Sequence, residues 1–138
     1  MSEEAPYGKA AINDIELRER RGGGAGSRDI AGAVGATEMA ARMWRFGPGD
    51  AMPLHRHGVQ EELYTLLSGG PQTMQIGLEE IEVEDGDWIC VPKDTPRRIM
   101  NQSDRDAAWL IVAAPVGSGI TDGIRLDPET GEEIPRPS

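Results

Sequence analysis

The chain has 138 residues, a length that fits one domain around a single hydrophobic core. Its formal net charge of −10 repels polyanions, so we expect neither nucleic acid nor an anionic membrane surface as a partner. The single cysteine rules out an intramolecular disulfide, and 18 glycines with 10 prolines favour short strands joined by turns, hence an all-β fold.

Residues 1–37 carry mixed charges and a glycine cluster, and they show no sustained apolar period. We therefore expect an N-terminal arm that lies outside the folded domain. The chain starts with acidic and polar residues, without a basic segment followed by an apolar one, and it contains no apolar run long enough to span a membrane. We expect a cytoplasmic protein.

Residues 38–115 form the one folded domain that we expect, because short apolar stretches alternate there with turn residues, as in a β-sandwich or closed barrel. Stretches 62–68 and 71–78 flank Gly69-Gly70, and we predict that they form a hairpin. After Pro115 the pattern is lost, so residues 116–138 are expected to be a C-terminal tail that wraps a neighbouring subunit or stays mobile. The predicted strands are residues 38–46, 62–68, 71–78, 79–87, 88–92, 97–101 and 107–115.

His55 and His57 are the only histidines of the chain, and they stand two residues apart in a polar stretch. Residues two apart on a strand point to the same face, so the two imidazoles converge at a distance that suits a divalent ion. Glu61 and Glu62 follow far enough along for a chain reversal to bring a carboxylate beside them. Two histidines with one carboxylate bind Fe, Mn, Ni or Zn and leave positions open for water or substrate. A divalent transition metal is therefore the expected cofactor.

Residues 49–69 resemble the first cupin motif, which has a glycine, an H-x-H pair, a glutamate and a closing glycine. The resemblance selects Glu62 rather than Glu61 as the third ligand, because only Glu62 has the motif's spacing to the closing glycine. It implies that the metal ligands are His55, His57 and Glu62. All five motif positions match, as Gly49, His55, His57, Glu62 and Gly69.

Residues 86–101 resemble the second cupin motif, with two departures from it. Asp94 stands where the family has a glycine, and Arg97 stands where the family has its fourth metal ligand, a histidine. A guanidinium has no lone pair to donate, so Arg97 cannot be a ligand. The motif positions that match are Gly86, Pro92 and Asn101.

Three interpretations of Arg97 stay open. In the first, three ligands hold the metal and Arg97 faces the open side, where it receives a substrate carboxylate or another oxyanion in a bidentate fork. In the second, Arg97 pairs with Glu62 and no metal binds. In the third, Arg97 turns outward, or Arg98 takes its place by a one-residue slip, and another group or water completes the coordination.

The resemblance implies a double-stranded β-helix, the jelly-roll barrel, for residues 38–115. Small single-domain proteins of this family commonly pair through sheet edges and exchanged arms, which would also cover exposed strand edges here. We therefore expect a homodimer.

Two functions from different classes stay open. One is a metal-dependent enzyme of the dioxygenase, isomerase or decarboxylase type on a small anionic organic substrate, in which Arg97 orients the anion and Tyr64 or Glu61 moves a proton. The other is a non-catalytic module that binds or senses a small ligand, with or without metal. Tyr64 could equally be a packing residue with a satisfied hydroxyl. Cys90 lies in an apolar stretch, which predicts a buried and inert thiol.

Overall fold

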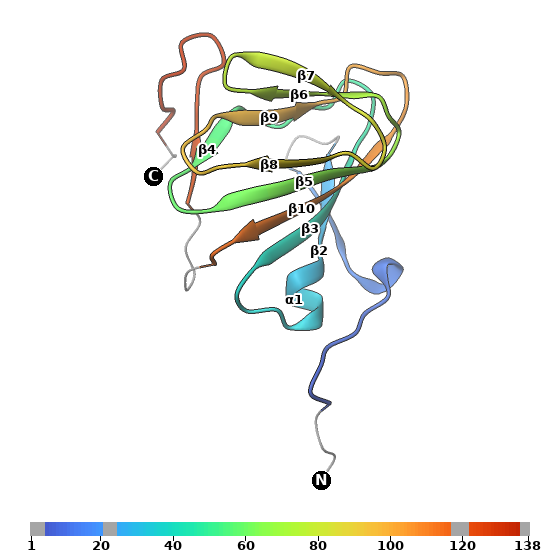
Figure 1. Cartoon of the computed structure of the whole chain (residues 1–138). Helices are drawn as coiled ribbons and strands as arrows, with labels where there is room; N and C mark the ends of the chain where they lie inside the picture. The colour runs from blue at the N-terminus through green and yellow to red at the C-terminus, as the bar shows by residue number, and fades with distance from the viewer. Residues whose placement is uncertain (1–4, 21–24, 117–121, 136–138) are drawn as a thin grey trace.

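The computed structural model describes residues 5–20, 25–116 and 122–135. The chain folds into two antiparallel sheets that face each other (Figure 1). One sheet has six strands, in the order β1 (Leu17–Glu19), β2 (Gly26–Asp29), β3 (Ala40–Phe46), β10 (Ala107–Ala114), β5 (Glu61–Ser68) and β8 (Trp88–Val91). The other has five, in the order β11 (Gly123–Arg125), β4 (His55–His57), β9 (Arg97–Met100), β6 (Gln72–Ile76) and β7 (Glu79–Val83). The predicted all-β jelly-roll fold is confirmed.

The core lies between the two sheets and follows from the two-residue period of the strands. Along β10, buried and partly exposed residues alternate without interruption, and Trp109 and Ile111 point inward. A strand whose alternate side chains are apolar buries one face and leaves the other for solvent. Both sheets contribute to the core, whose largest apolar members are Trp109, Tyr64, Phe46, Leu66, Met74 and Ile99.

The predicted hairpin of residues 62–68 and 71–78 is wrong. The strands β5 and β6 lie in different sheets, because both edges of β5 are already paired, one with β8 and the other with β10. The chain crosses between the sheets at Gly69, whose φ of 91° favours glycine. A Cβ at that position would lie 2.1 Å from the backbone oxygen of Asp106. The hairpin forms one strand later, where β6 pairs with β7.

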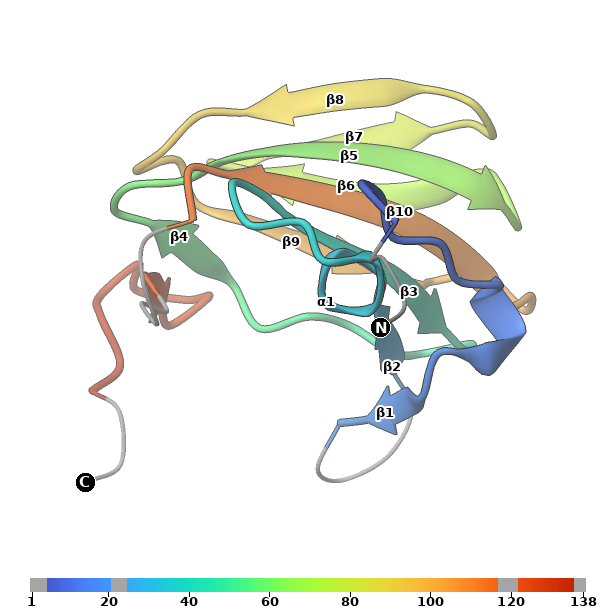
Figure 2. The same ribbon diagram turned by 90° about the horizontal axis from the view of Figure 1, so that it is seen from below.

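The sequence suggested that the N-terminal segment is an arm outside the folded domain, but its described strands belong to a sheet. Strand β2 pairs with β3 and β1 pairs with β2, which extends the six-stranded sheet. A short helix, α1 (Ile30–Val34), follows β2 and lies beside β3 (Figure 2). Backbone pairing at a sheet edge needs no apolar period in the added strand, which is why hydrophobic patterning did not reveal it. The domain boundaries stay a prediction.

The C-terminal segment also differs from the expected wrapping or mobile tail. Its described part returns to the same chain, where β11 pairs with β4 at the edge of the five-stranded sheet (Figure 1). Leu126, which follows β11, is buried. The expectation for residues 117–121 and 136–138 falls outside the described residues.

The edge strand β8 corrects the expectation for the cysteine. Cys90 is exposed, and so is Trp88 two residues earlier, with 61 % of its surface accessible. Apolar character within a four-residue strand does not decide which face is covered, because only alternate residues of β8 point to the core. Elsewhere, the described residues include no helix that is both long and apolar enough to cross a membrane.

Candidate metal centre

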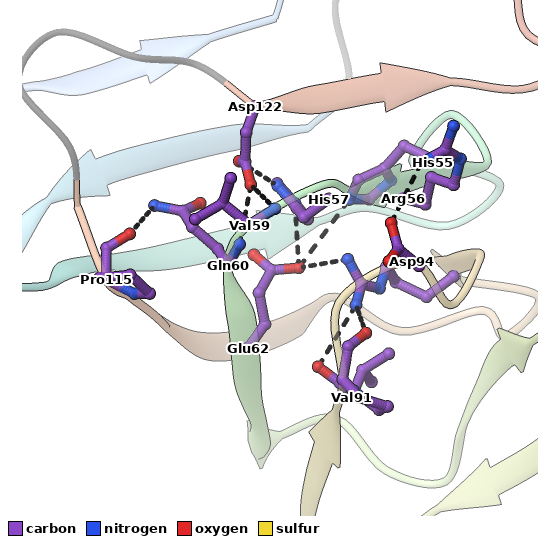
Figure 3. Close-up of polar contacts among 12 residues, drawn as sticks. His55, Arg56, His57, Val59, Gln60, Glu62, Val91, Asp94, Pro115 and Asp122 are labelled. Carbon is purple, nitrogen blue, oxygen red and sulfur yellow. Dashed lines mark hydrogen bonds and ion pairs between the residues drawn. The ribbon is translucent and has the colours of Figure 1, made fainter.

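The two histidines and the glutamate singled out in the sequence meet between the two sheets (Figure 3). His55 and His57 lie on β4, and Glu62 is the second residue of β5 in the opposite sheet. The imidazole rings are side by side, with centroids 5.1 Å apart and planes at 85°. They share a face because two residues on a strand complete one period. Glu62 alternates with exposed Glu61 and therefore points inward, at 7 % exposure.

One carboxylate oxygen is the meeting point of the three candidate ligands. Glu62 Oε1 lies 3.2 Å from His57 Nε2 and 4.0 Å from His55 Nε2. One ligand atom from each of the three residues falls within 4.8 Å of the others. Two imidazole nitrogens and one carboxylate oxygen at this spacing form a donor set that fits a divalent transition metal, with positions left for water or substrate.

Each histidine makes a second contact that directs its Nε2 atom towards Glu62. The His55 Nδ1 atom lies 2.9 Å from the backbone oxygen of Pro53. A carbonyl oxygen can only accept, so the neutral ring carries its hydrogen on Nδ1 and keeps the lone pair on Nε2. The His57 Nδ1 atom lies 2.7 Å from Oδ1 of Asp122. Both rings therefore direct their Nε2 atom to the same point.

Asp122 is a residue of the site that the sequence did not reveal. It comes just before β11 and reaches His57 across 65 residues of chain. Its other oxygen accepts hydrogen bonds from the backbone N–H groups of Val59 and Gln60, both at 2.8 Å. Neither cupin motif includes this position, and a lone aspartate before a glycine is an ordinary turn signal. No local pattern could have identified it.

Arg97 is fully buried and faces the site. Its Nη2 donates to the backbone oxygens of Pro92 at 2.7 Å and Val91 at 3.3 Å, and its Nη1 lies 3.4 Å from Glu62 Oε1. Among the described residues, its Nε and Nη1 atoms have no hydrogen-bond partner. The side chain thus makes an ion pair with Glu62 and still has free donors.

The third interpretation of Arg97 is therefore wrong. Arg97 lies directly opposite His55 in the pairing of β9 with β4, which points both side chains to the same face. Arg98 points to the other face, where its Nε donates to Gln75 at 2.8 Å. No one-residue slip brings Arg98 into the site. The ion pair of the second interpretation is present together with the free donors that the first requires.

Tyr64 completes the inner face of β5 beside Glu62. Its side chain is fully buried and packs edge to face against Trp109, with centroids 6.4 Å apart. The hydroxyl donates to Glu62 Oε1 at 2.7 Å. Glu61, the alternative proton carrier, is exposed on the outer face of the strand and has no place in the site.

The carboxylate of Glu62 is held in its charged form. Burial raises the pKa of Glu62, but the contacts with His57, the Tyr64 hydroxyl and the Arg97 guanidinium outweigh burial and lower the pKa below its ordinary value. Burial and then the neighbouring Glu62 charge raise the pKa of Tyr64 well above its usual range. At neutral pH the pair is therefore a carboxylate with a protonated phenol beside it.

The two histidines have pKa values displaced in opposite directions. Burial lowers the pKa of His55 and exceeds the opposing effects of Pro53 and Glu62. Burial also acts to lower the pKa of His57, but hydrogen bonds and charge from Glu62 and Asp122 raise it above its ordinary value. Burial acts to raise the pKa of Asp122, but the His57 contact and the two backbone N–H groups outweigh it and lower that pKa. Protons therefore compete with a metal more strongly at His57 than at His55.

Comparison with known proteins gives relatives with several activities. The chain is 32 % identical over 65 residues to a gentisate 1,2-dioxygenase of Haloferax, a match of 47 % of this chain and 18 % of that protein. Well under half of each curated relative's length is spanned by this chain. A sugar phosphate isomerase of Silicibacter pomeroyi superposes with a TM-score of 0.73 at 20 % identity and 88 % coverage of both chains. An oxalate decarboxylase of Bacillus subtilis gives a TM-score of 0.72 at 20 % identity, covering 91 % of this chain and 33 % of that one.

The solved structures show that this chain shares their fold. Their sequence identities of about 20 % are too low to transfer an activity. The sequence model of the cupin domain matches residues 42–113, just over half of the chain. That range runs from within β3 to within β10 and includes both histidines, Glu62, Tyr64 and Arg97. The strand pairing, the converging ligands and this match together place the chain in the cupin domain family.

Proposed function

We propose that this protein is a metal-dependent cupin enzyme that acts on a small anionic organic substrate. His55, His57 and Glu62 hold a divalent transition metal, Fe, Mn, Ni or Zn, and Arg97 receives the anionic group of the substrate. The observation that carries this proposal is the buried guanidinium of Arg97, which faces Glu62 and has donors free on Nε and Nη1 among the described residues.

A buried cation with free donors is costly unless something compensates for it. Burying a charge or leaving a buried donor unpaired costs on the order of 1–3 kcal/mol or more per group. In Arg97 the Nη2 atom is satisfied by two backbone oxygens, which fixes the orientation of the guanidinium plane. An anion that accepts from Nη1 or Nε would add a charge-assisted hydrogen bond to a donor that has none among the described residues. The anion would meet a guanidinium whose orientation is already fixed.

Charge balance supports the same substrate class. The ligand set contributes one negative charge from Glu62, and Arg97 contributes one positive charge beside it. A divalent cation held by two neutral imidazoles and Glu62 therefore gives the centre a net positive charge, which favours an anion even in a protein with a net charge of −10. When bound, the metal supplies a Lewis acid that polarises a substrate oxygen.

The protein's own residues place and hold protons in this site. Tyr64 keeps its proton at Oη, because burial and Glu62 raise its pKa, and it donates to Glu62 Oε1. That hydrogen bond fixes the carboxylate in the orientation that faces both histidines. Tyr64 is also placed to donate a proton to a substrate bound beside Glu62.

The names of three similar proteins are consistent with an anionic substrate, although two of these proteins are known to share only the fold. Their names specify gentisate, a sugar phosphate and oxalate, which are all anions at neutral pH. The names of these proteins specify three different reactions, which are dioxygenation, isomerisation and decarboxylation. A shared barrel with different chemistries means that the reaction type has to come from experiment.

The metal claim is tested by elemental analysis of untagged protein after reconstitution with Fe, Mn, Ni and Zn in turn. We expect close to one metal per chain in the wild type and a large loss in His55→Ala and Glu62→Ala. Less than about a tenth of a metal per chain with every ion would falsify the metal site.

The role of Arg97 is tested with oxalate as the probe anion, by calorimetry on the metal-loaded protein. Arg97→Gln should weaken oxalate binding at least about tenfold while the metal content is kept, since the variant removes a charge-assisted hydrogen bond and the positive charge beside the anion. The matched control is Arg98→Gln, which changes the neighbouring arginine on the outer face. Equal oxalate affinity in both variants and the wild type contradicts the anion role. Tighter metal binding in Arg97→His with unchanged oxalate affinity does the same.

A non-catalytic binding or sensing module is the second candidate. It is favoured by the small number of acid–base groups, because both histidines of the chain are in the ligand set and Glu61 lies on the outer face. The two candidates separate when an anion that binds through Arg97 is incubated with the metal-loaded protein. Conversion of that anion at a rate lost in Tyr64→Phe supports the enzyme, and binding without any conversion across a panel of carboxylates supports the module.

We also propose that the protein is a homodimer. The outer face of the six-stranded sheet exposes apolar side chains on its edge strand β8 and on the neighbouring β5. Apolar groups gathered at an open sheet edge are suited to contact with a second copy. The residues that support this are Leu63 at 40 %, Leu67 at 44 % and Trp88 at 61 % exposure.

A further inference from the structure

Asp122 connects the C-terminal segment to the candidate metal centre. Its Oδ1 lies 2.7 Å from His57 Nδ1, and its Oδ2 accepts from the backbone N–H groups of Val59 and Gln60 (Figure 3). The side chain is only 8 % exposed. Three donors therefore surround a group that can only accept, and within the described residues the contacts of this carboxylate are directed at His57 and the chain just after it.

The segment that carries Asp122 is held by regular backbone pairing. Strand β11 pairs with β4, and Gly123 lies directly opposite His57. Just after β11, the N–H of Leu126 donates to the backbone oxygen of Leu54 at 2.8 Å. Because β9 takes the other edge of β4, the histidine strand is fixed on both sides. Asp122 is thus placed by the sheet and not by a free loop.

The acceptor at Nδ1 decides which nitrogen of His57 faces the other ligands. Both ring nitrogens of His57 face carboxylate oxygens, and the contact of Nδ1 with Asp122, at 2.7 Å, is the shorter of the two. We therefore assign the hydrogen of the neutral ring to Nδ1 and the lone pair to Nε2. The Nε2 atom is the one that lies 3.2 Å from Glu62 Oε1. Histidines that bind metals generally donate their second N–H to a carboxylate or carbonyl in this manner.

We propose that Asp122 is a positioning residue for His57, which holds the ring as its Nδ1–H form and directs Nε2 to the point shared with His55 and Glu62. The C-terminal segment is then part of the metal centre, although the match to the cupin domain ends at residue 113. The consequence for metal affinity rests on the function proposed above, whereas the tautomer and ring orientation belong to the metal-free protein.

The two histidines differ in what orients them, and this difference makes the proposal testable. His55 is oriented by the backbone oxygen of Pro53, two residues away on the same stretch. His57 is oriented by a side chain 65 residues away. Removing the Asp122 carboxylate should therefore disturb His57 and leave His55 unchanged.

The experiment compares wild type, Asp122→Ala, Asp122→Asn and Glu133→Gln. The last is a matched control, because Glu133 also binds the C-terminal segment to β4, through Arg56, without touching a ligand. Imidazole ¹⁵N shifts of the metal-free proteins, recorded above the pKa of both rings, report the tautomer of each histidine. Calorimetry with Zn²⁺ reports the metal affinity.

We expect the Nδ1–H form of His57 in the wild type and in Glu133→Gln, and a mixture of tautomers in Asp122→Ala. Zn²⁺ affinity should fall about 10–100-fold in Asp122→Ala, the usual cost of losing the partner of a metal-bound histidine. The Zn²⁺ affinity of Asp122→Asn should lie between those of the wild type and Asp122→Ala, since the amide oxygen can still accept from Nδ1–H but the charge is lost. The shifts of His55 should stay the same in all four proteins.

The proposal is overturned if His57 in the wild type carries its hydrogen on Nε2, a result that needs no variant to fold. It is also overturned if Asp122→Ala keeps the Nδ1–H form and binds Zn²⁺ within about twofold of the wild type. A loss of affinity in Glu133→Gln equal to that in Asp122→Ala would assign the effect to docking of the segment and overturn the role of the carboxylate. If no protein binds metal while Asp122→Ala still alters the His57 tautomer, the metal function fails and the positioning role stands.

Discussion

Glu62 Oε1 is the atom at which four side chains meet. The hydroxyl of Tyr64 donates to it, the Nε2 atoms of both histidines face it, and the guanidinium of Arg97 lies 3.4 Å away. A metal bound to Glu62 would lie beside this fixed positive charge, which lowers the metal affinity, and under the proposed function the same charge attracts the substrate anion. The effect on metal affinity and the effect on anion binding can be measured separately with single substitutions.

The histidines should titrate on opposite sides of the ordinary value of 6.5. Burial lowers the pKa of His55, whereas contacts with Glu62 and Asp122 overcome burial and raise the pKa of His57. NMR titration of the two C2–H resonances in the metal-free protein measures both values directly. A His57 value below that of His55 contradicts the geometry described for Asp122.

The raised pKa of His57 also sets the sign of its effect on stability. Its folded-state pKa exceeds the unfolded value of 6.5, so its contribution is fully present below pH 6.5 and is lost as the pH rises through the folded pKa. The difference in free energy of unfolding between wild type and His57→Gln, measured by urea denaturation of metal-free protein, should therefore shrink as the pH rises from 6.5. A difference that grows over this interval gives the wrong sign.

Tyr64→Phe removes the hydrogen bond to Glu62 with little change in volume. We expect a loss of about 2 kcal/mol in the free energy of unfolding, because a buried carboxylate loses a charge-assisted donor. Urea denaturation at neutral pH measures the loss. Tyr7→Phe is the matched control, since Tyr7 is 71 % exposed and should change stability by only a few tenths of a kcal/mol.

At the scale of elements, the crossing from β5 to β6 takes the chain from the six-stranded sheet to the five-stranded sheet. The turn places Gly69 against the backbone of Asp106, at the start of the chain that enters β10. A hairpin at this point would have put β6 beside β5, whereas β6 pairs with β9 in the sheet that carries the histidine strand β4. The glycine is therefore required by a close approach as well as by its dihedral angle.

Gly69→Ala should destabilise the protein more than Gly77→Ala. Both residues have positive φ, at 91° and 61°, and the left-handed conformation alone costs an alanine about 1–2 kcal/mol. Only at Gly69 does the added Cβ also meet backbone, at 2.1 Å from the Asp106 oxygen, whereas at Gly77 nothing lies within 4 Å. Thermal and urea unfolding of both variants measure the difference. Equal losses would show that the crossing tolerates a side chain.

At the scale of the whole molecule, the two sheets differ in what their outer faces present. The six-stranded sheet exposes Trp88, Leu63 and Leu67 near the β8 edge, in a chain whose overall charge of −10 repels its own copies. An apolar area at this edge can overcome that repulsion over a short distance, and added salt assists it by screening.

The proposed homodimer should therefore depend on Trp88. Sedimentation velocity of the wild type should show a dimer at micromolar concentration, and Trp88→Lys should shift the protein to monomer by placing a charge in the contact. Leu78→Lys is the control, because Leu78 is fully exposed but lies on the turn between β6 and β7 in the other sheet. A monomeric wild type at every concentration contradicts the dimer.

The all-β class and the histidine pair could be predicted from local spacing, whereas the jelly-roll barrel came from the family resemblance. Alternating apolar residues determine which face of a strand is buried, and two histidines two residues apart share a face whatever surrounds them. The seven predicted strands of residues 38–115 correspond to β3 and β5 to β10, although the pairing of β5 was wrong. Family resemblance then selected Glu62 over Glu61, and the structure points Glu62 inward.

Only the tertiary structure decided the features that depend on contacts between distant segments. It turned Arg97 inward against Glu62, exposed Cys90 at a sheet edge, added β1 and β2 to the sheet and brought Asp122 to His57. Period and motif say which face a residue occupies, but they contain no information about which strand lies opposite. Strand pairing is cooperative over the whole sheet. The surroundings of the histidines are therefore determined by the pairing of β4 with β9 and β11, which no local pattern in the sequence specifies.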